Sequence, residues 1–246
     1  MDLENSLTAA VKGFGIFKRQ KNILISLVSF PPILSIGLPA VIWLLITVRS
    51  IPTGVITVLL NAFSFYFVIL ACFLPITLAS YSIVRDKIEK SLEPLLATPI
   101  TDSEFLFGKS LAAFLPSIAA TYAGIVIFMP LADALTYNKL GYLFFLNGTM
   151  IVILLLTLPL SCMLSVEMNV IISSRVNDLR TAAELGALVL LPFGAIYVLS
   201  ELDFIPLNEV NLLMISVFVA AVDVFLFYLS RITFRREEIL AESKQE

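Results

Sequence analysis

Two acidic side chains inside long apolar stretches are the residues of this sequence whose types could do chemistry. Asp223 lies in AAVDVFLF, and Glu167 lies near the end of an earlier apolar stretch, just before Asn169. A carboxylate at membrane depth is costly and normally faces other helices or a wet cavity, where it can contact a cation or a polar substrate. Arg231 follows Asp223 after about 12 Å of helix, so a structural role near the membrane surface is the alternative, which we favour. Arg175 is similarly near Glu167 and Asn169, which we therefore expect to be hydrated.

Other kinds of chemistry lack the residues they need. The chain contains no histidine, which removes the commonest metal ligand and the usual proton carrier near neutral pH. Cys72 and Cys162 lie in different apolar stretches, where we expect buried free thiols. The sequence has no Gly-x-x-x-x-Gly-Lys-Ser/Thr phosphate-binding loop. We therefore expect no catalytic residue, no metal site and no cofactor bound by this chain.

The elements that position these residues are apolar spans. Of the 246 residues, 59% are hydrophobic and only 14% are charged, whereas soluble domains are about 25% charged. A helix of about 20 apolar residues crosses a bilayer core. We expect an all-α integral membrane protein in which residues 1–246 form a single transmembrane domain. Its six transmembrane helices are predicted at roughly 23–48, 53–84, 107–131, 142–172, 182–200 and 211–230.

The chain begins with an amphipathic segment. Residues 2–20 place apolar side chains on one side of a helix, with Lys12, Lys18 and Arg19 elsewhere; the apolar positions are Leu3, Leu7, Val11 and Phe14. This pattern predicts an N-terminal helix in the headgroup region of the membrane. A merely solvated helix is the alternative.

The distribution of cations predicts the orientation of the spans. Of the 16 lysine and arginine residues, all but Arg49 and Lys139 fall in the terminal segments and in the loops after the second and fourth spans. Loops rich in lysine and arginine stay in the cytoplasm. We therefore expect both termini and the loop 85–109 to be cytoplasmic.

The loop 85–109 reads RDKIEKSLEPLLATPITDSEFLFGK and carries several helix start and stop signals. Pro94 suits the first turn of a helix, and Pro99 disfavours helix at the preceding residue. Thr101 and Glu104 form a capping box for the next helix. The pattern predicts a short helix at about 92–98 between two long ones. An ordinary turn, whose prolines only separate the two long helices, explains the same residues, and the physics alone leaves both open.

The same loop resembles the type-2 ABC exporter permeases. The matching residues are Ser91-Leu92-Glu93, the run Pro94-Leu95-Leu96-Ala97-Thr98-Pro99, and Gly108-Lys109. The sequence departs from the family pattern where Asp86-Lys87 replaces Glu-Arg, Ile88 replaces an acidic residue and Lys90 replaces glycine. The segment 172–183, followed by a span with Pro192, is similar to the family's connection between its fourth and fifth helices.

The resemblance implies a permease subunit of an ATP-driven exporter in the plasma membrane. Its coupling helix would dock on a separate ATPase subunit that binds ATP and Mg. The docking residues would be Leu92, Glu93, Pro94, Leu95, Leu96, Ala97, Thr98 and Pro99. A second permease, identical or related, would complete the transport path, and Asp223 could then hydrogen-bond across the pair. We expect contact with membrane lipid and none with nucleic acid.

Two other functions compete with this one. A secondary carrier or channel without an ATPase would use Asp223, and Glu167 with it, to couple ions, but no inverted repeat is detectable. An intramembrane enzyme would need histidine or paired carboxylates within the spans. Members of the family that the loop resembles export drugs, peptides, polysaccharides and lipids, and some serve ion extrusion or metal-site maturation. The sequence selects none of these.

Overall fold

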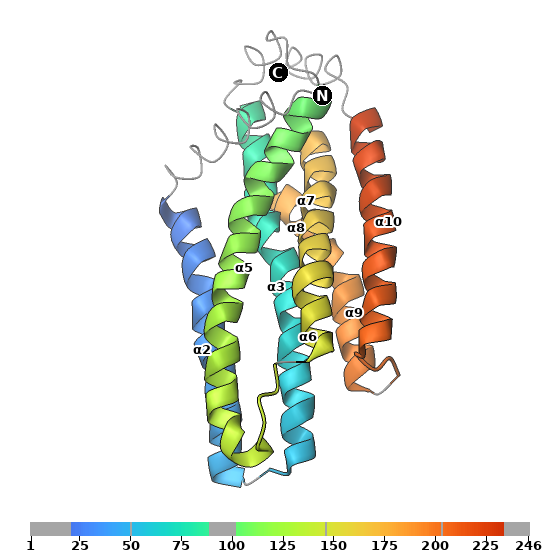
Figure 1. Cartoon of the computed structure of the whole chain (residues 1–246). Coiled ribbons are helices and arrows are strands. Elements are labelled where there is room, and N and C mark those ends of the chain that lie inside the picture. The colour runs from blue at the N-terminus through green and yellow to red at the C-terminus, as the bar shows by residue number, and fades with distance from the viewer. Residues whose placement is uncertain (1–20, 50, 89–101, 146, 203, 234–246) are drawn as a thin grey trace.

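The computed structural model describes residues 21–49, 51–88, 102–145, 147–202 and 204–233. These residues form helices and no strand (Figure 1). The elements are α2 (Lys21–Arg49), α3 (Thr53–Ile88), α5 (Asp102–Leu140), α6 (Gly148–Val152), the π-helical turn η1 (Ile153–Thr157), α7 (Leu158–Arg175), α8 (Leu179–Gly186), the 3-10 turn η2 (Ala187–Val189), α9 (Leu190–Glu201) and α10 (Glu209–Thr233). The predicted segment 2–20 and the predicted coupling helix lie outside the described residues.

Six helical stretches are long and apolar enough to cross a membrane, which confirms the predicted fold class at this level. They are Ser29–Arg49, Thr53–Arg85, Leu106–Leu140, Gly148–Arg175, Leu179–Ser200 and Glu209–Ser230. Two predicted limits were wrong. The third span continues through Pro130 to Leu140 because a membrane helix tolerates an interior proline. The fourth begins at Gly148 and not at 142, because the residues before it are not helical.

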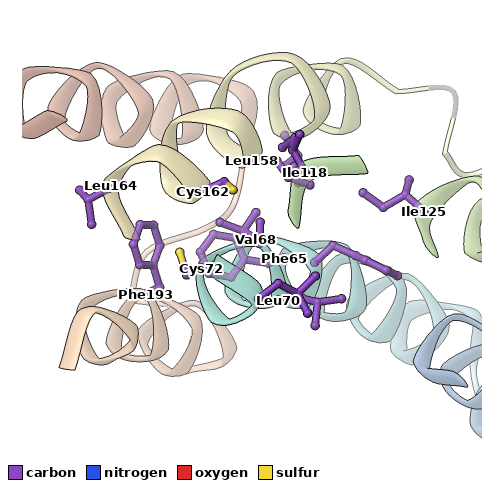
Figure 2. Packing of buried hydrophobic residues seen from close by; sticks show 14 of the residues in the cluster. Phe65, Val68, Leu70, Cys72, Ile118, Ile125, Leu158, Cys162, Leu164 and Phe193 are labelled. Atoms are coloured by element: carbon purple, nitrogen blue, oxygen red, sulfur yellow. The ribbon is translucent and has the colours of Figure 1, made fainter. Parts of the chain in front are cut away.

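Helix α3 occupies the centre of the bundle. It makes its most extensive contacts with α7 and α5, and it also touches α2, α8 and α9. Figure 2 shows side chains of α3, such as Phe65 and Val68, packed among residues of α5, α7 and α9. Cys72 and Cys162 lie in this core as buried free thiols, as predicted. Dense packing around one helix gives the bundle a rigid central axis.

The segment after α5 turns back into the bundle. Gly141 adopts a φ of 78°, which glycine reaches without steric cost. Phe144 and Phe145 are then buried, and Phe145 packs on Phe128 of α5 with ring centroids 5.3 Å apart. Asp133 of α5 accepts a 2.9 Å hydrogen bond from the Phe144 N–H. In Figure 1 this segment runs back between α5 and α3 to the start of α6.

A proline explains the π-helical turn η1. Pro159 lacks an N–H, and its ring would crowd the carbonyl four residues earlier in a regular helix. The helix widens instead, and the Leu158 N–H donates to the Ile153 carbonyl, five residues back. The Leu154 carbonyl would then need an N–H from position 159, which proline cannot supply. Tyr122 of α5 fills this vacancy, because its hydroxyl donates a 2.6 Å bond to the Leu154 carbonyl.

Candidate functional site

The predicted docking loop is flanked by the two longest helices of the described chain. Helix α3 has 36 residues and α5 has 39, about 54 and 58 Å at about 1.5 Å per residue. Helix α5 begins at Asp102, directly after the position at which the capping box predicts a helix start. The cap residue Thr101 and all eight predicted docking residues lie outside the described residues. The structure therefore leaves the docking residues as a prediction and describes the supports on either side.

A hydrogen bond joins the C-terminal end of α3 to the N-terminal end of α5. Lys109 of α5 is only 5% exposed and donates a 3.2 Å hydrogen bond to the Ser82 carbonyl of α3. Arg85 lies with its guanidinium 5.3 Å from the centre of the Tyr81 ring and donates to the Tyr81 hydroxyl at 2.6 Å. Glu104 is buried at the start of α5. Since a bond joins α3 and α5 next to the loop, a force on the loop would reach both helices together.

A second candidate site runs along the fourth span. Small polar side chains occur at every fourth position, on one stripe of the helix, and are 0–1% exposed: Thr157, Ser161, Ser165, Asn169 and Ser173. We call this set the polar stripe. Residues four apart lie on the same face of a helix, so the stripe presents a continuous row of hydrogen-bonding groups.

The polar stripe binds neighbouring helices directly. Ser165 donates a 2.6 Å bond to the Cys72 carbonyl of α3, and the Cys72 thiol donates to the Ser161 carbonyl at 3.3 Å. The hydroxyls of Thr157 and Ser216 of α10 lie 2.9 Å apart. Small polar residues allow membrane helices to approach closely and hydrogen-bond across the interface. The stripe therefore holds α3 and α10 against the fourth span.

Asn169 corrects one prediction from the sequence. It is fully buried, not hydrated: its side-chain oxygen accepts from the Ser80 hydroxyl at 3.2 Å, and its amide donates to the Ser165 carbonyl at 2.8 Å. Gly186 of α8 covers it so closely that a Cβ there would lie 1.8 Å from the Asn169 oxygen. Arg175 is near in sequence, but α3 and α8 pack over this face of α7 and shield it from water.

Glu167 and Asp223 are buried acidic residues on neighbouring helices. Glu167 is 4% exposed, which also contradicts its predicted hydration, and Asp223 is 7% exposed. Both carboxylate oxygens of Asp223 and one of Glu167 are sealed from solvent without a hydrogen-bond partner. The two carboxyl groups lie within electrostatic range of each other. The contact between Thr157 of η1 and Ser216 of α10 fixes the register of the fourth span and α10. Glu167 lies ten residues beyond Thr157 and Asp223 seven beyond Ser216, so the two acids differ in depth by about 5 Å.

The turn between α7 and α8 lies within the segment 172–183. Asp178 caps α8 and accepts hydrogen bonds of 2.8 Å from the Thr181 N–H and hydroxyl. These bonds to Thr181 hold the pKa of the Asp178 carboxyl below its ordinary value. Arg180 and Glu184 form an exposed ion pair one turn apart. The turn is therefore a well-capped start for the fifth span.

An apolar groove lies between α7, α9 and α10. It has a volume of about 500 Å³ and is lined by residues such as Leu164, Phe193 and Val222. The side chains of Phe218 and Met214 on its rim are largely exposed. Such a surface suits contact with hydrocarbon chains.

The described helices define an architecture compatible with a multi-pass membrane protein, with six helices long and apolar enough to span. No protein-family model matches the chain, and no curated protein matches it.

Sequence reasoning missed two features of the candidate site. The polar stripe had a detectable signal, because its members recur at intervals of four residues within an apolar span. The approach of Glu167 to Asp223 had none, because the two residues are distant in sequence and only the packing of α7 on α10 brings them together.

Proposed function

We propose that this chain is the permease subunit of an ATP-driven exporter, docked through the loop 85–109 on a separate ATPase subunit. The observation that carries the proposal is the run Leu92–Pro99, which resembles the coupling segment of type-2 ABC permeases. The Lys109–Ser82 bond, which joins α3 and α5 beside this loop, supports it. ATP and Mg belong to the partner, because the sequence has no phosphate-binding loop. The transport path forms with a second permease, identical or related, in the plasma membrane.

On this proposal the long helices transmit the movement of the ATPase. Closure of the ATPase subunits displaces the coupling helix, and α3 and α5 carry that displacement into the bundle because they are joined at their bases. Helix α3 packs extensively on α7, so the polar stripe would receive the same movement. A stiff lever is required because a flexible loop would absorb the motion.

The experiment tests docking through a charge placed in the apolar turn of the loop. The tagged chain is purified from its native membranes, and Mg-ATP hydrolysis is measured in the eluate. We expect ATPase activity with the unchanged chain and its loss with Leu96→Asp or Leu95→Asp, because a carboxylate cannot enter an apolar docking groove without a large desolvation cost.

The matched control introduces the same charge at the other end of the bundle. Tyr142→Asp changes an exposed residue beyond α5 and should leave the co-purified ATPase activity intact. The chain expressed without other subunits should hydrolyse no ATP. Undiminished activity with both leucine variants would refute the assignment of the coupling helix.

A secondary carrier without an ATPase is the second candidate. The buried pair Glu167 and Asp223 favours it, since ion coupling uses titratable groups inside the membrane. Transport by the purified chain in liposomes without any ATPase subunit would support this candidate over the first.

A further inference from the structure

The acidic pair of Glu167 and Asp223 has no role in docking an ATPase. It lies inside the bundle, about 10 to 12 Å of helix from the ends of the spans at Arg175 and Ser230. Three of its four carboxylate oxygens are sealed from solvent and make no hydrogen bond. Buried polar groups in proteins are almost always satisfied, so an acidic pair left without partners indicates that a partner is missing.

Among the side chains that the structure describes, none that interacts electrostatically with Asp223 is a cation. Those that do are Glu167 and Cys162 on α7 and Cys72 on α3. Within the polar stripe, the Thr157 hydroxyl contacts Ser216 of α10 and the Ser165 hydroxyl donates to α3. The Ser161 hydroxyl donates to its own helix, and the Ser173 hydroxyl is buried without a partner. In a low-dielectric interior without a cation, it is unfavourable for two buried carboxylates within electrostatic range of each other to stay charged together, because each charge disfavours the other.

The number of ligands limits the kind of cation. Sites for zinc use three or four protein ligands, and calcium takes six to eight oxygens. In the part of the chain that the structure describes, no group of three or more histidine, cysteine, aspartate or glutamate side chains could hold a metal ion. With one carboxyl group protonated, the pair carries a single negative charge, which a monovalent cation neutralises and a divalent cation would overcompensate.

We propose that Glu167 and Asp223 form a binding site for a small monovalent cation, an alkali-metal or ammonium ion, taken in exchange for a proton. Without the cation both side chains are carboxylic acids. When the cation binds, one O–H bond breaks, the proton leaves to solvent, and the resulting carboxylate pairs with the cation. Net charge inside the bundle is unchanged, so the exchange avoids the cost of a buried uncompensated charge.

Proton release tests this exchange. The purified chain, in detergent and weak buffer with a pH indicator, is titrated with sodium, potassium or ammonium chloride. N-methylglucamine chloride provides the same ionic strength with a cation too bulky for the pair. We expect saturable proton release with at least one of the three small cations and none with N-methylglucamine. The three arms distinguish metal ions from ammonium.

Variants then assign the release to the pair. Asp223→Asn and Glu167→Gln should each abolish it, whereas Glu184→Gln, which removes an exposed carboxylate, should leave it unchanged. Asp223→Glu keeps a carboxyl group and should retain release, and this guards against a variant that fails to fold. The bound cation should also raise the melting temperature of the unchanged chain and not that of the Asn and Gln variants.

Absence of proton release with all three cations would overturn the proposal, as would release that persists in both Asp223→Asn and Glu167→Gln. The assay contains no ATPase. Its outcome is therefore independent of the docking experiment, and either proposal can fail alone.

Discussion

Asn169 illustrates how a single buried polar residue constrains three helices. Its side chain bonds Ser80 of α3 and its own helix at Ser165, and Gly186 of α8 lies directly over it. An amide in this position has no freedom to rotate away, because both ends are bonded and the residue is fully buried. The close approach of α8 therefore depends on the absence of a side chain at position 186.

Replacement of this glycine gives a direct test. Gly186→Ala places a Cβ 1.8 Å from the Asn169 oxygen, and we expect a loss of about 1 to 3 kcal/mol in unfolding free energy from overpacking. Denaturation in mixed detergent and SDS measures it. Gly194→Ala is the matched control, since nothing lies within 4 Å of its added Cβ. Equal effects at both positions would contradict the close contact.

A second residue-scale prediction concerns pH and the cap of α8. Asp178 accepts two bonds from Thr181, which lower its pKa in the folded state. A carboxylate with a depressed pKa stabilises the fold above its ordinary value of about 4, and that contribution disappears as the pH falls through the lower folded value. Amide protection at 179–182 should therefore decrease below about pH 4.

Two variants separate the cap from the charge. Asp178→Asn retains a good N-cap and should make the protection at 179–182 independent of acid pH. Asp178→Ala removes the acceptor and should reduce protection at every pH. Hydrogen exchange, expressed as protection factors, measures both, and a decrease with Asp178→Asn equal to that with Asp178→Ala would argue against the cap.

At the scale of elements, the fourth span is a helix with a built-in irregularity. Pro159 produces the π-helical turn η1, and Tyr122 of α5 compensates the carbonyl that the turn leaves unpaired. The compensation comes from another helix, so the irregularity couples the fourth span to α5. Turns of this kind are frequent at functional positions, and this one ends at Thr157, the first residue of the polar stripe.

The coupling can be measured with a double-mutant cycle. Tyr122→Phe removes the bond to the Leu154 carbonyl and should cost about 1 kcal/mol of unfolding free energy. In a Pro159→Ala background the cost should be smaller, because position 159 then supplies an N–H to that carbonyl. Tyr228→Phe, an exposed position on α10, is the control and should have no effect. Additive costs in the double variant would contradict this role for Tyr122.

At the scale of the whole molecule, the helices are staggered. Phe145 packs on Phe128, so the return segment meets α5 about 18 Å of helix before the end at Leu140. Figure 1 shows α2, α3 and α5 reaching beyond the ends of α9 and α10. A bilayer core of about 30 Å cannot contain α3 or α5 upright. We therefore infer that these helices tilt in the membrane or project from it on the Arg49 side.

The orientation predicted from the cations has a simple test. Cys72 and Cys162 are buried and should react little with maleimides. With Lys139→Cys, an exposed position near the Arg49 side, an impermeant maleimide should label intact cells. With Arg180→Cys, also exposed, labelling should require permeabilised cells. The reverse pattern would overturn the cytoplasmic placement of the loop 85–109.

The sequence by itself determined the number of spans and their approximate positions. The reason is that membrane insertion depends on a local sum of hydrophobicity over about 20 residues. It also indicated the buried thiols and the start of α5 after the capping box. The sequence did not show what happens at Pro130 and Pro159. The helix α5 continues through Pro130, whereas the fourth span widens into the π-helical turn η1 before Pro159.

Only the tertiary structure decided which side of each span faces its neighbours. In soluble helices the buried face is marked by an apolar stripe, but lipid and the interior of a helix bundle are equally apolar. Hydropathy therefore could not show that Asn169 lies under Gly186, or that Glu167 approaches Asp223. Packing alone brought these residues together, because their contacts join helices that are far apart along the chain.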